Sequence, residues 1–176
     1  AVAGTGGCVH EHGNVHSTDA RADEIGRRVR AFIDDPGADG FDRLARDVFA
    51  YQIARNPPYA RYCERRGVGA DVASWRDIPP LPVHAFKEVS LACGSPALIF
   101  RTSGTTDGMN ARGTHEVVDP TIYAHALCRG FREFVLPDRE RIRVLSLVAS
   151  PRARADSSLS HMSGVILDAF GDSESE

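Results

Sequence analysis

Apolar residues recur with the period of an α-helix in the first third of the chain. The first apolar stripe keeps the spacing i, i+4, i+7 and i+8 and consists of Ile25, Val29, Phe32 and Ile33. Such a stripe predicts an amphipathic helix that begins near Asp19. A second stripe, over residues 41–53, predicts another helix, which the Asn56-Pro57-Pro58 sequence terminates because proline cannot continue the hydrogen-bond ladder. A short third helix is expected over residues 59–66.

Two more helices are predicted in the last third of the chain. Asp119 is a good N-cap and Pro120 a good first residue for the first of them, which ends before Pro137. Its apolar face is formed by Ile122, Tyr123, Leu127, Phe131 and Phe134. The last helix is predicted from Asp156 or Ser157 to residue 170. Its inward face consists of Leu159, Met162, Ile166 and Phe170.

Four segments of the chain are predicted to be strands. The sequences "VSLAC" (89–93) and "ALIFRT" (97–102) flank a Gly-Ser-Pro turn and follow a proline-interrupted connection over residues 78–89. The sequence "HEVVD" (115–119) predicts a short strand. The sequence "IRVLSLV" (142–148) is apolar almost throughout, as expected of a strand that is covered on both faces.

The order of these elements is two or three helices, then strand, loop, strand, helix, strand and helix. This alternation predicts an α/β fold, with a helical N-terminal segment followed by a sheet with flanking helices. Because about four strands are visible and the chain stops after a helix, we expect an incomplete sheet and a chain that is part of a larger protein. Residues 1–18 show no period and are expected to be disordered or foreign to the fold, and residues 172–176 to form a frayed polar tail.

Composition and charge exclude several classes of protein. The chain has 176 residues, of which 42% are hydrophobic and 26% charged, as is ordinary for globular proteins. The net charge of −3 gives no reason to expect nucleic acid or an anionic membrane surface as a partner. No apolar run approaches the roughly 18 residues of a membrane span and no signal peptide opens the chain, so a cytoplasmic protein is expected.

Cysteine and histidine side chains are common metal ligands, and several lie near the N-terminus of the chain. Four cysteines, Cys8, Cys63, Cys93 and Cys128, form no CxxC pair, which indicates structural thiols in a reducing compartment. Near the N-terminus, Cys8 lies close in sequence to His10, His12 and His16. No second ligand pair follows at the spacing of a zinc site, so a flexible segment is the favoured interpretation and no metal site is predicted.

A hydroxyl-rich loop follows the second predicted strand. Ser103, Thr105 and Thr106 offer hydroxyl donors, while Gly104 and Gly108 allow successive backbone N–H groups to converge on one point. Such loops bind phosphate, and a loop that leaves a strand of an α/β sheet is a common place for a ligand. The Walker A pattern is absent because no Gly-Lys-Ser/Thr follows. A simple surface turn is the alternative for this composition.

Three stretches of the chain together resemble one family. The sequence "RTSGTTDGMNARGTH" (101–115) is similar to the phosphate loop of adenylate-forming enzymes. It is more closely similar to that of the acyl-protein synthetases of the bacterial lux fatty-acid reductase system, a bioluminescence-related family. The sequence "IPPLPVHAFKE" (78–88) resembles a run upstream of that loop, and "SSLSHM" (157–162) resembles a segment downstream. The resemblance implies a partial adenylation domain over residues 19–171.

The resemblance implies a ligase that uses ATP and Mg²⁺ to activate a fatty or other aliphatic carboxylic acid as an acyl-adenylate, for transfer to a protein thiol. An acyl-reductase partner protein is also implied. The phosphates would be held by Ser103, Gly104, Thr105, Thr106, Gly108 and Arg112. The acid pocket would be bordered by His115, Ser158, His161 and Met162. The adenine motif and the cysteine that accepts the acyl group would follow residue 176, so we expect the chain to be inactive alone and identify no catalytic residue.

The loop also departs from the pattern of the wider superfamily. Asp107 stands where the usual loop has glycine, and no lysine follows, so Arg112 is expected to supply the cation. A coenzyme-A ligase of the phenylacetate type shares the loop and is one alternative. A non-catalytic remnant or interaction domain, in which the loop is only a turn, is another. For Ser157 and Ser158 a cap of the last helix is the favoured interpretation, and for His115 an ordinary surface or helix-flanking histidine is slightly favoured.

Overall fold

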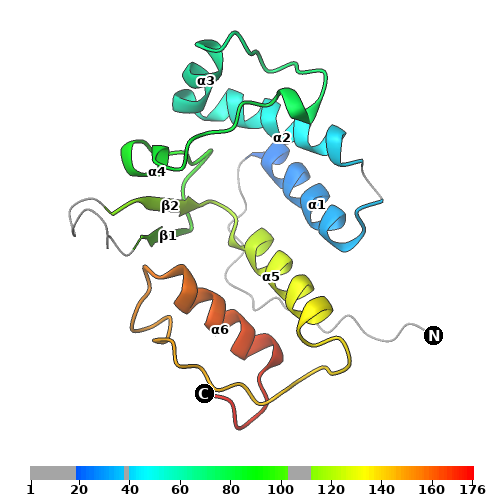
Figure 1. Cartoon of the computed structure of the whole chain (residues 1–176), viewed down its shortest axis with the longest axis vertical. Coiled ribbons are helices and arrows are strands. Elements are labelled where there is room, and N and C mark those ends of the chain that lie inside the picture. The colour runs from blue at the N-terminus through cyan, green and yellow to red at the C-terminus, as the bar shows by residue number, and fades with distance from the viewer. Residues whose placement is uncertain (1–18, 38–39, 103–111) are drawn as a thin grey trace. The chain divides into compact units, whose positions relative to one another are not determined.

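The structure is a computed structural model that describes residues 19–37, 40–102 and 112–176. Its elements follow one another in the order α1 (Ala20–Asp34), α2 (Phe41–Arg55), α3 (Pro57–Glu64), η1 (Trp75–Asp77), α4 (Ala85–Glu88), β1 (Leu98–Arg101), β2 (Thr114–Val117), α5 (Pro120–Phe134) and α6 (Ser158–Phe170) (Figure 1). The described residues form two compact units, Asp19–Pro120 and Thr121–Glu176, which we call the N-terminal unit and the C-terminal unit.

Helices α1 and α3 of the N-terminal unit begin at side-chain caps. Asp19 Oδ1 accepts a hydrogen bond from the backbone N–H of Arg21 at 3.1 Å, and Asn56 Oδ1 accepts one from that of Tyr59 at 3.0 Å. Each cap satisfies a backbone donor that has no partner within the first turn of its helix. The prolines that follow Asn56 take the first positions of α3, where their missing N–H costs nothing. The three helices predicted in this region are therefore confirmed.

The core of the N-terminal unit lies between α2 and α3. Phe49 is 1% exposed and packs edge-on against the ring of Tyr59, with 5.8 Å between ring centroids. The buried Cys63 and Val72 complete this cluster. The Tyr59 hydroxyl also donates a hydrogen bond to the carbonyl oxygen of Pro79 at 2.9 Å. The proline-rich connection is thus attached to the helices through the same tyrosine that fills their core.

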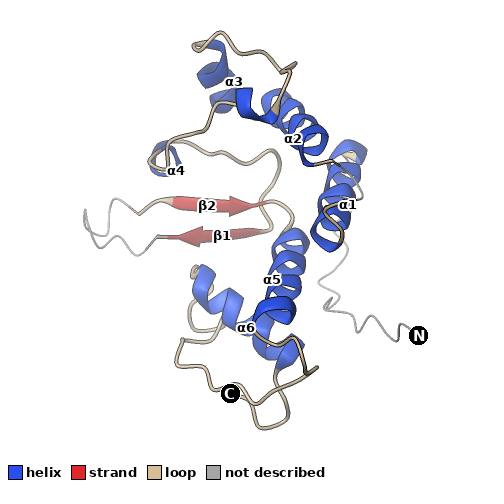
Figure 2. Ribbon diagram, turned by 45° about the vertical axis from the view of Figure 1, so that its right-hand side comes forward, coloured by secondary structure: helices blue, strands red, loops and turns tan. Residues whose placement is uncertain are grey.

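Strands β1 and β2 form a two-stranded antiparallel sheet (Figure 2). Leu98 pairs with Val117 and Arg101 with Thr114, so the connection of residues 102–113 joins the two ends of a hairpin. Phe100 is 5% exposed, whereas its neighbour Ile99 is 45% exposed, as expected of a sheet with one covered face. The strands predicted at 97–102 and 115–119 are confirmed, with bounds shifted by a residue or two.

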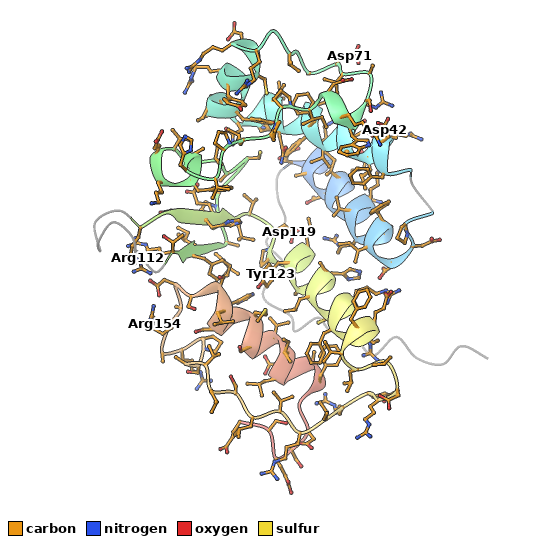
Figure 3. The ribbon with its side chains drawn as sticks, viewed as in Figure 1. Asp42, Asp71, Arg112, Asp119, Tyr123 and Arg154 are labelled. Carbon is orange, nitrogen blue, oxygen red and sulfur yellow. The ribbon has the colours of Figure 1, made fainter. Side chains whose placement is uncertain are left out.

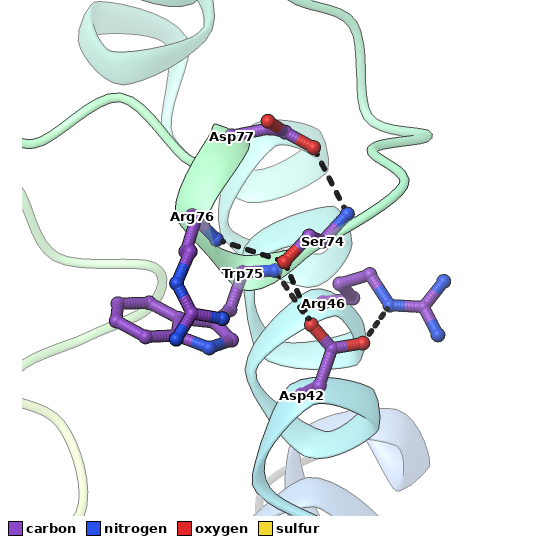
Figure 4. A network of polar contacts seen from close by, with 6 residues as sticks. All are labelled: Asp42, Arg46, Ser74, Trp75, Arg76 and Asp77. Atoms are coloured by element: carbon purple, nitrogen blue, oxygen red, sulfur yellow. Dashed lines mark hydrogen bonds and ion pairs between the residues drawn. The ribbon is translucent and has the colours of Figure 1, made fainter.

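A polar network attaches η1 to α2. Asp42 Oδ1 accepts hydrogen bonds from the backbone N–H of Trp75 at 2.8 Å and from Ser74 Oγ at 3.2 Å, and Asp42 Oδ2 is 3.0 Å from Arg46 Nε (Figure 4). The Trp75 N–H contributes most to holding the pKa of the Asp42 carboxyl below its usual value of 3.8. The ionised carboxylate is therefore the form that the fold favours.

Removing the charge of Asp42 is expected to lower the stability of the N-terminal unit. Asp42→Asn keeps an oxygen acceptor for Trp75 but weakens the network, so the urea midpoint at neutral pH should fall. Because the folded pKa is lowered, the stabilising effect of the charge is present above pH 3.8 and disappears as the pH falls through the lower folded value. The urea midpoints of the two proteins should converge over that acidic range.

Asp71→Asn is the matched control for this measurement. Asp71, which is labelled in Figure 3, lies in the same unit and is exposed. It makes no ion pair with any described residue. Its substitution should leave the urea midpoint almost unchanged, because isolated surface charges contribute little. Equal effects of the two substitutions would contradict the proposed role of the Asp42 network.

The C-terminal unit is built from α5 and α6. Phe170 is 0% exposed and packs against Phe131 of α5, with 4.9 Å between ring centroids. Cys128 and Leu136 are the other buried residues of this cluster. Ser157 Oγ accepts a hydrogen bond from the backbone N–H of Ser160 at 3.2 Å and caps α6. Both helices predicted in this region are confirmed. Their predicted apolar faces are wrong at Phe134 and Leu159, which are 80% and 51% exposed.

Two predicted strands are wrong. Residues 89–93 form no ladder with any described residue, and residues 142–148 form only one parallel bridge, between Ile142 and Gly171. The second segment was expected to be covered on both faces, yet Leu145 is 66% and Leu147 96% exposed. Its backbone instead bonds to residues near the C-terminus: Asp172 N donates to Ile142 O at 3.1 Å, and the backbone N–H of residue 176 donates to the carbonyl of residue 144 at 3.0 Å.

The sheet among the described residues is therefore smaller than the predicted one. The described residues combine helices with one small sheet, which is consistent with part of an α/β fold. The wider sheet expected from four strands is not formed, because an apolar segment becomes a strand only where a neighbouring strand satisfies its backbone.

Candidate functional site

The connection between β1 and β2 contains the predicted phosphate loop. Ser103, Gly104, Thr105, Thr106 and Gly108 lie outside the described residues. The two ends of the connection are described and are closed by hydrogen bonds. Thr102 N donates to Gly113 O at 3.0 Å, and Gly113 N donates to Thr102 Oγ1 at 2.8 Å. The connection therefore starts and ends at one point, at the end of the hairpin.

Arg112 lies at this closed end of the hairpin (Figure 3). Its Nε donates a hydrogen bond to the carbonyl oxygen of Thr102 at 2.5 Å, and one terminal nitrogen is 3.5 Å from the carbonyl oxygen of Arg101. These contacts hold the guanidinium at the base of the predicted phosphate loop. The residue that was expected to supply the cation is thus positioned by the backbone at the end of β1 and at Thr102, which follows it.

A cavity of about 400 Å³ lies within the N-terminal unit and is bordered by β2. It is lined by Gln52, Asn56, Tyr59, Ile78, Pro79, Pro80, Leu81, Phe86, Leu91, Thr114, His115 and Glu116, and we call it the diproline cavity. Its lining joins two of the three stretches that carry the family resemblance, because residues 78–86 meet residues 114–115 there. Sequence reasoning identified these stretches separately and did not predict that they share a cavity.

His115 forms part of the cavity wall together with Phe86. The two rings are stacked, with 5.3 Å between centroids and 9° between planes. Next to them, Ser90 Oγ donates a hydrogen bond to Glu116 Oε2 at 2.5 Å. The imidazole is therefore positioned by an aromatic contact from α4, a helix within the proline-rich connection that the sequence did not predict.

The other predicted pocket residues belong to α6. Ser158, His161 and Met162 lie near the beginning of this helix, in the C-terminal unit. The His161 ring packs against the Tyr123 ring at 5.5 Å, and burial raises the pKa of the Tyr123 hydroxyl. The diproline cavity includes His115 but none of these three residues.

Neither of the two cysteines with a shifted pKa, Cys63 and Cys93, is an activated nucleophile. Burial raises the pKa of the Cys63 thiol and of the Cys93 thiol, although the charge of Arg55 acts in the opposite direction at Cys93. A raised pKa keeps a thiol protonated at neutral pH and makes it a weaker nucleophile. Both thiols therefore have the properties of structural cysteines.

Asn56 and Gln52 are the lining residues that sequence reasoning missed. Asn56 was interpreted only as part of a helix terminator, although an Asn before two prolines is also a typical cap for the next helix. It is 3% exposed in the structure. Gln52 lies one turn earlier on α2 and reaches the same cavity. The sequence alone did not indicate that these two residues border the same cavity.

Comparisons with protein-family models, with curated proteins and with solved structures found no match to the chain. None of the helices in the described ranges has both the length and the apolar character that a membrane span requires. Over the same ranges, no three His, Cys, Asp or Glu side chains are grouped so that they could hold a metal ion.

Proposed function

We propose that the chain takes part in the ATP-dependent activation of a fatty or other aliphatic carboxylic acid as an acyl-adenylate. The observation that carries this proposal is the Ser-Gly-Thr-Thr sequence in the connection between two paired strands, with Arg112 held at its base. The resemblance to acyl-protein synthetases supplies the reaction, and the meeting of two resembling stretches at the diproline cavity supports it.

In this proposal the loop and Arg112 bind the phosphates of ATP. A carboxylate oxygen of the acid attacks the α-phosphorus, the bond to the bridging oxygen breaks, and pyrophosphate leaves with Mg²⁺ as its counterion. Negative charge spreads over the phosphoryl oxygens during this step, so fixed N–H and O–H donors and a cation contribute most. Ser103, Thr105 and Thr106 offer such donors, and a protein thiol is the proposed acyl acceptor.

The assignment of residues to the acid pocket stays a prediction. His115 lines a cavity in the N-terminal unit, whereas Ser158, His161 and Met162 belong to α6. A partner protein that reduces the acyl group and a cytoplasmic location are likewise proposed from the resemblance alone.

Nucleotide binding can be tested directly by NMR on the isotope-labelled chain. Addition of ATP with Mg²⁺ should shift the backbone amides of residues 102–115, because the loop donors and Arg112 contact the phosphates. Ser103→Ala should weaken this binding about tenfold, since a hydrogen bond to a charged oxygen is worth more than a neutral one.

Ser173→Ala is the matched control, because Ser173 is exposed and outside the predicted site. It should bind ATP like the unchanged chain. Shifts confined to other regions, or an unchanged affinity in Ser103→Ala, would contradict the proposal and favour an interaction domain in which residues 103–111 form only a turn.

A further inference from the structure

Lys87 of α4 lies against the closed end of the hairpin formed by β1 and β2. A methyl group placed on Gly113 would be 3.3 Å from Lys87 Cγ and 3.4 Å from Thr102 Cγ2. These distances are shorter than an ordinary contact between carbon atoms, so glycine at this position lets the lysine stem approach the backbone. The lysine therefore reaches the point at which Thr102 and Gly113 close the hairpin.

Stacked rings hold α4 in this place. The planes of the Phe86 and His115 rings differ by 9°, and their centroids are 5.3 Å apart. Phe86 precedes Lys87 on α4, and His115 belongs to β2, so the contact joins the helix to the strand (Figure 2). Because α4 has only four residues, it needs such a contact to keep a fixed position.

Lys87 is the only lysine of the chain, in which lysine and arginine together number 21. Arginine is therefore the cation that this chain uses elsewhere, for example in the ion pair of Arg28 with Asp47. A lysine ammonium differs from a guanidinium because it is a compact charge with three donors that can turn toward an oxygen. This difference points to a role for the ammonium itself.

Lys87 and Arg112 bring two positive charges to the closed end of the hairpin. Arg112 Nε donates to the carbonyl oxygen of Thr102, and the glycine that the Lys87 stem approaches directly follows Arg112 in the chain. Like charges held near one point repel each other, and an anion that binds both of them removes this repulsion. The arrangement therefore favours an anionic ligand.

A triphosphate chain is the anion that suits this pair of cations. It keeps several negative charges even when Mg²⁺ is bound, so one guanidinium leaves part of its charge without a counterion. Arginine binds phosphate oxygens through a planar pair of N–H donors, whereas lysine binds them as a point charge. No lysine follows the predicted phosphate loop in the sequence, and α4 brings one to the end of the hairpin.

We propose that Lys87 is a second phosphate-binding cation of this chain, whose ammonium binds the triphosphate together with the guanidinium of Arg112. The inference rests on the proposed function, because it assumes that phosphates bind at the closed end of the hairpin. It adds a binding residue that the sequence patterns did not assign, and it gives a role to the packing of α4 against β2.

Lys87→Met tests the proposal, because it removes the charge but keeps an unbranched stem next to Gly113. The probes are ATP with Mg²⁺ and inorganic triphosphate with Mg²⁺, and their affinities are read from the NMR shifts of residues 102 and 112–115. Both affinities should fall about tenfold or more, since a charge-assisted contact to phosphate is lost. Lys87→Arg, which keeps the charge, should recover most of the lost affinity.

Arg43→Met is the matched control, because it removes one positive charge from an exposed position on α2 in the same unit. It should bind both probes like the unchanged chain. An equal loss of affinity in the two Met variants would overturn the proposal, since it would show only a general attraction between the anion and the charge of the protein.

The single lysine also permits a measurement that a purely structural role would not affect. The ε-amino group of Lys87 is acetylated with acetic anhydride, and the modified peptide is quantified by mass spectrometry. At a probe concentration ten times its Kd, the rate should fall about tenfold, because only about a tenth of the chain is then without ligand. Sodium chloride at the same ionic strength should leave the rate unchanged.

Three results separate this proposal from the proposed function. Unchanged affinity in a folded Lys87→Met variant, or an unchanged acetylation rate with bound ATP, would overturn the role of Lys87 and leave the proposed function standing. Lys87-dependent binding of inorganic triphosphate without any binding of ATP would support the pair of cations and contradict the proposed function. Binding of neither probe would overturn both.

Discussion

Phe49→Ala should lower the free energy of unfolding of the N-terminal unit by about 3–5 kcal/mol, the range found when a buried aromatic ring is removed. Phe49 is 1% exposed, and its ring packs against Tyr59. The substitution removes apolar contacts and leaves a cavity that the helices can fill only partly. Because whole domains are stable by only about 5–15 kcal/mol, much of the margin of this unit would disappear.

Hydrogen exchange read residue by residue is the suitable measurement, because it reports on each unit separately. Protection of amides in α2 and α3 should fall most. Phe41→Ala is the control on the same helix, since Phe41 is 51% exposed, and it should cost about 1 kcal/mol. An equal loss for both substitutions would show that the core is not centred on Phe49.

Phe170→Ala is the corresponding change in the C-terminal unit and should also cost about 3–5 kcal/mol. Phe170 is 0% exposed and contacts Phe131, and the guanidinium of Arg132 lies 5.3 Å from its ring centroid. Both an aromatic contact and a cation–π contact are lost with the ring. Protection of amides in α5 and α6 should decrease accordingly.

Phe134→Ala provides a control of identical chemistry. Phe134 lies at the end of α5 and is 80% exposed, so its removal should change the free energy of unfolding by no more than about 0.5 kcal/mol. If Phe170→Ala were equally mild, the packing of α6 against α5 would not be what stabilises this unit.

The helices were predictable because their signals are local. The apolar stripe of α1, the Asn56-Pro57 boundary and the capping serine before α6 each lie within a few residues of the element that they define. The spacing of side chains along one face and the caps at each end are sufficient to specify such elements. These predictions needed no knowledge of distant parts of the chain.

The sheet and the cavity were not predictable in the same way. Residues 142–148 have the composition of a buried strand, but whether they form one depends on partners that no local pattern reveals. The role of Asn56 in the cavity depends on residues 78–86 and on β2, which are far from it in sequence. Among the predicted phosphate ligands, only Arg112 lies within the described residues, where it donates a hydrogen bond to the carbonyl oxygen of Thr102, directly after β1.

The two phenol contacts to the proline-rich connection hold one wall of the diproline cavity in place. Tyr59 donates to Pro79 O at 2.9 Å, and Tyr62 donates to Pro80 O at 2.8 Å. The proline rings already restrict the backbone, so this wall has little conformational entropy left to lose on binding. This wall is therefore preorganised, so a molecule that entered the cavity would not have to order this part of the chain.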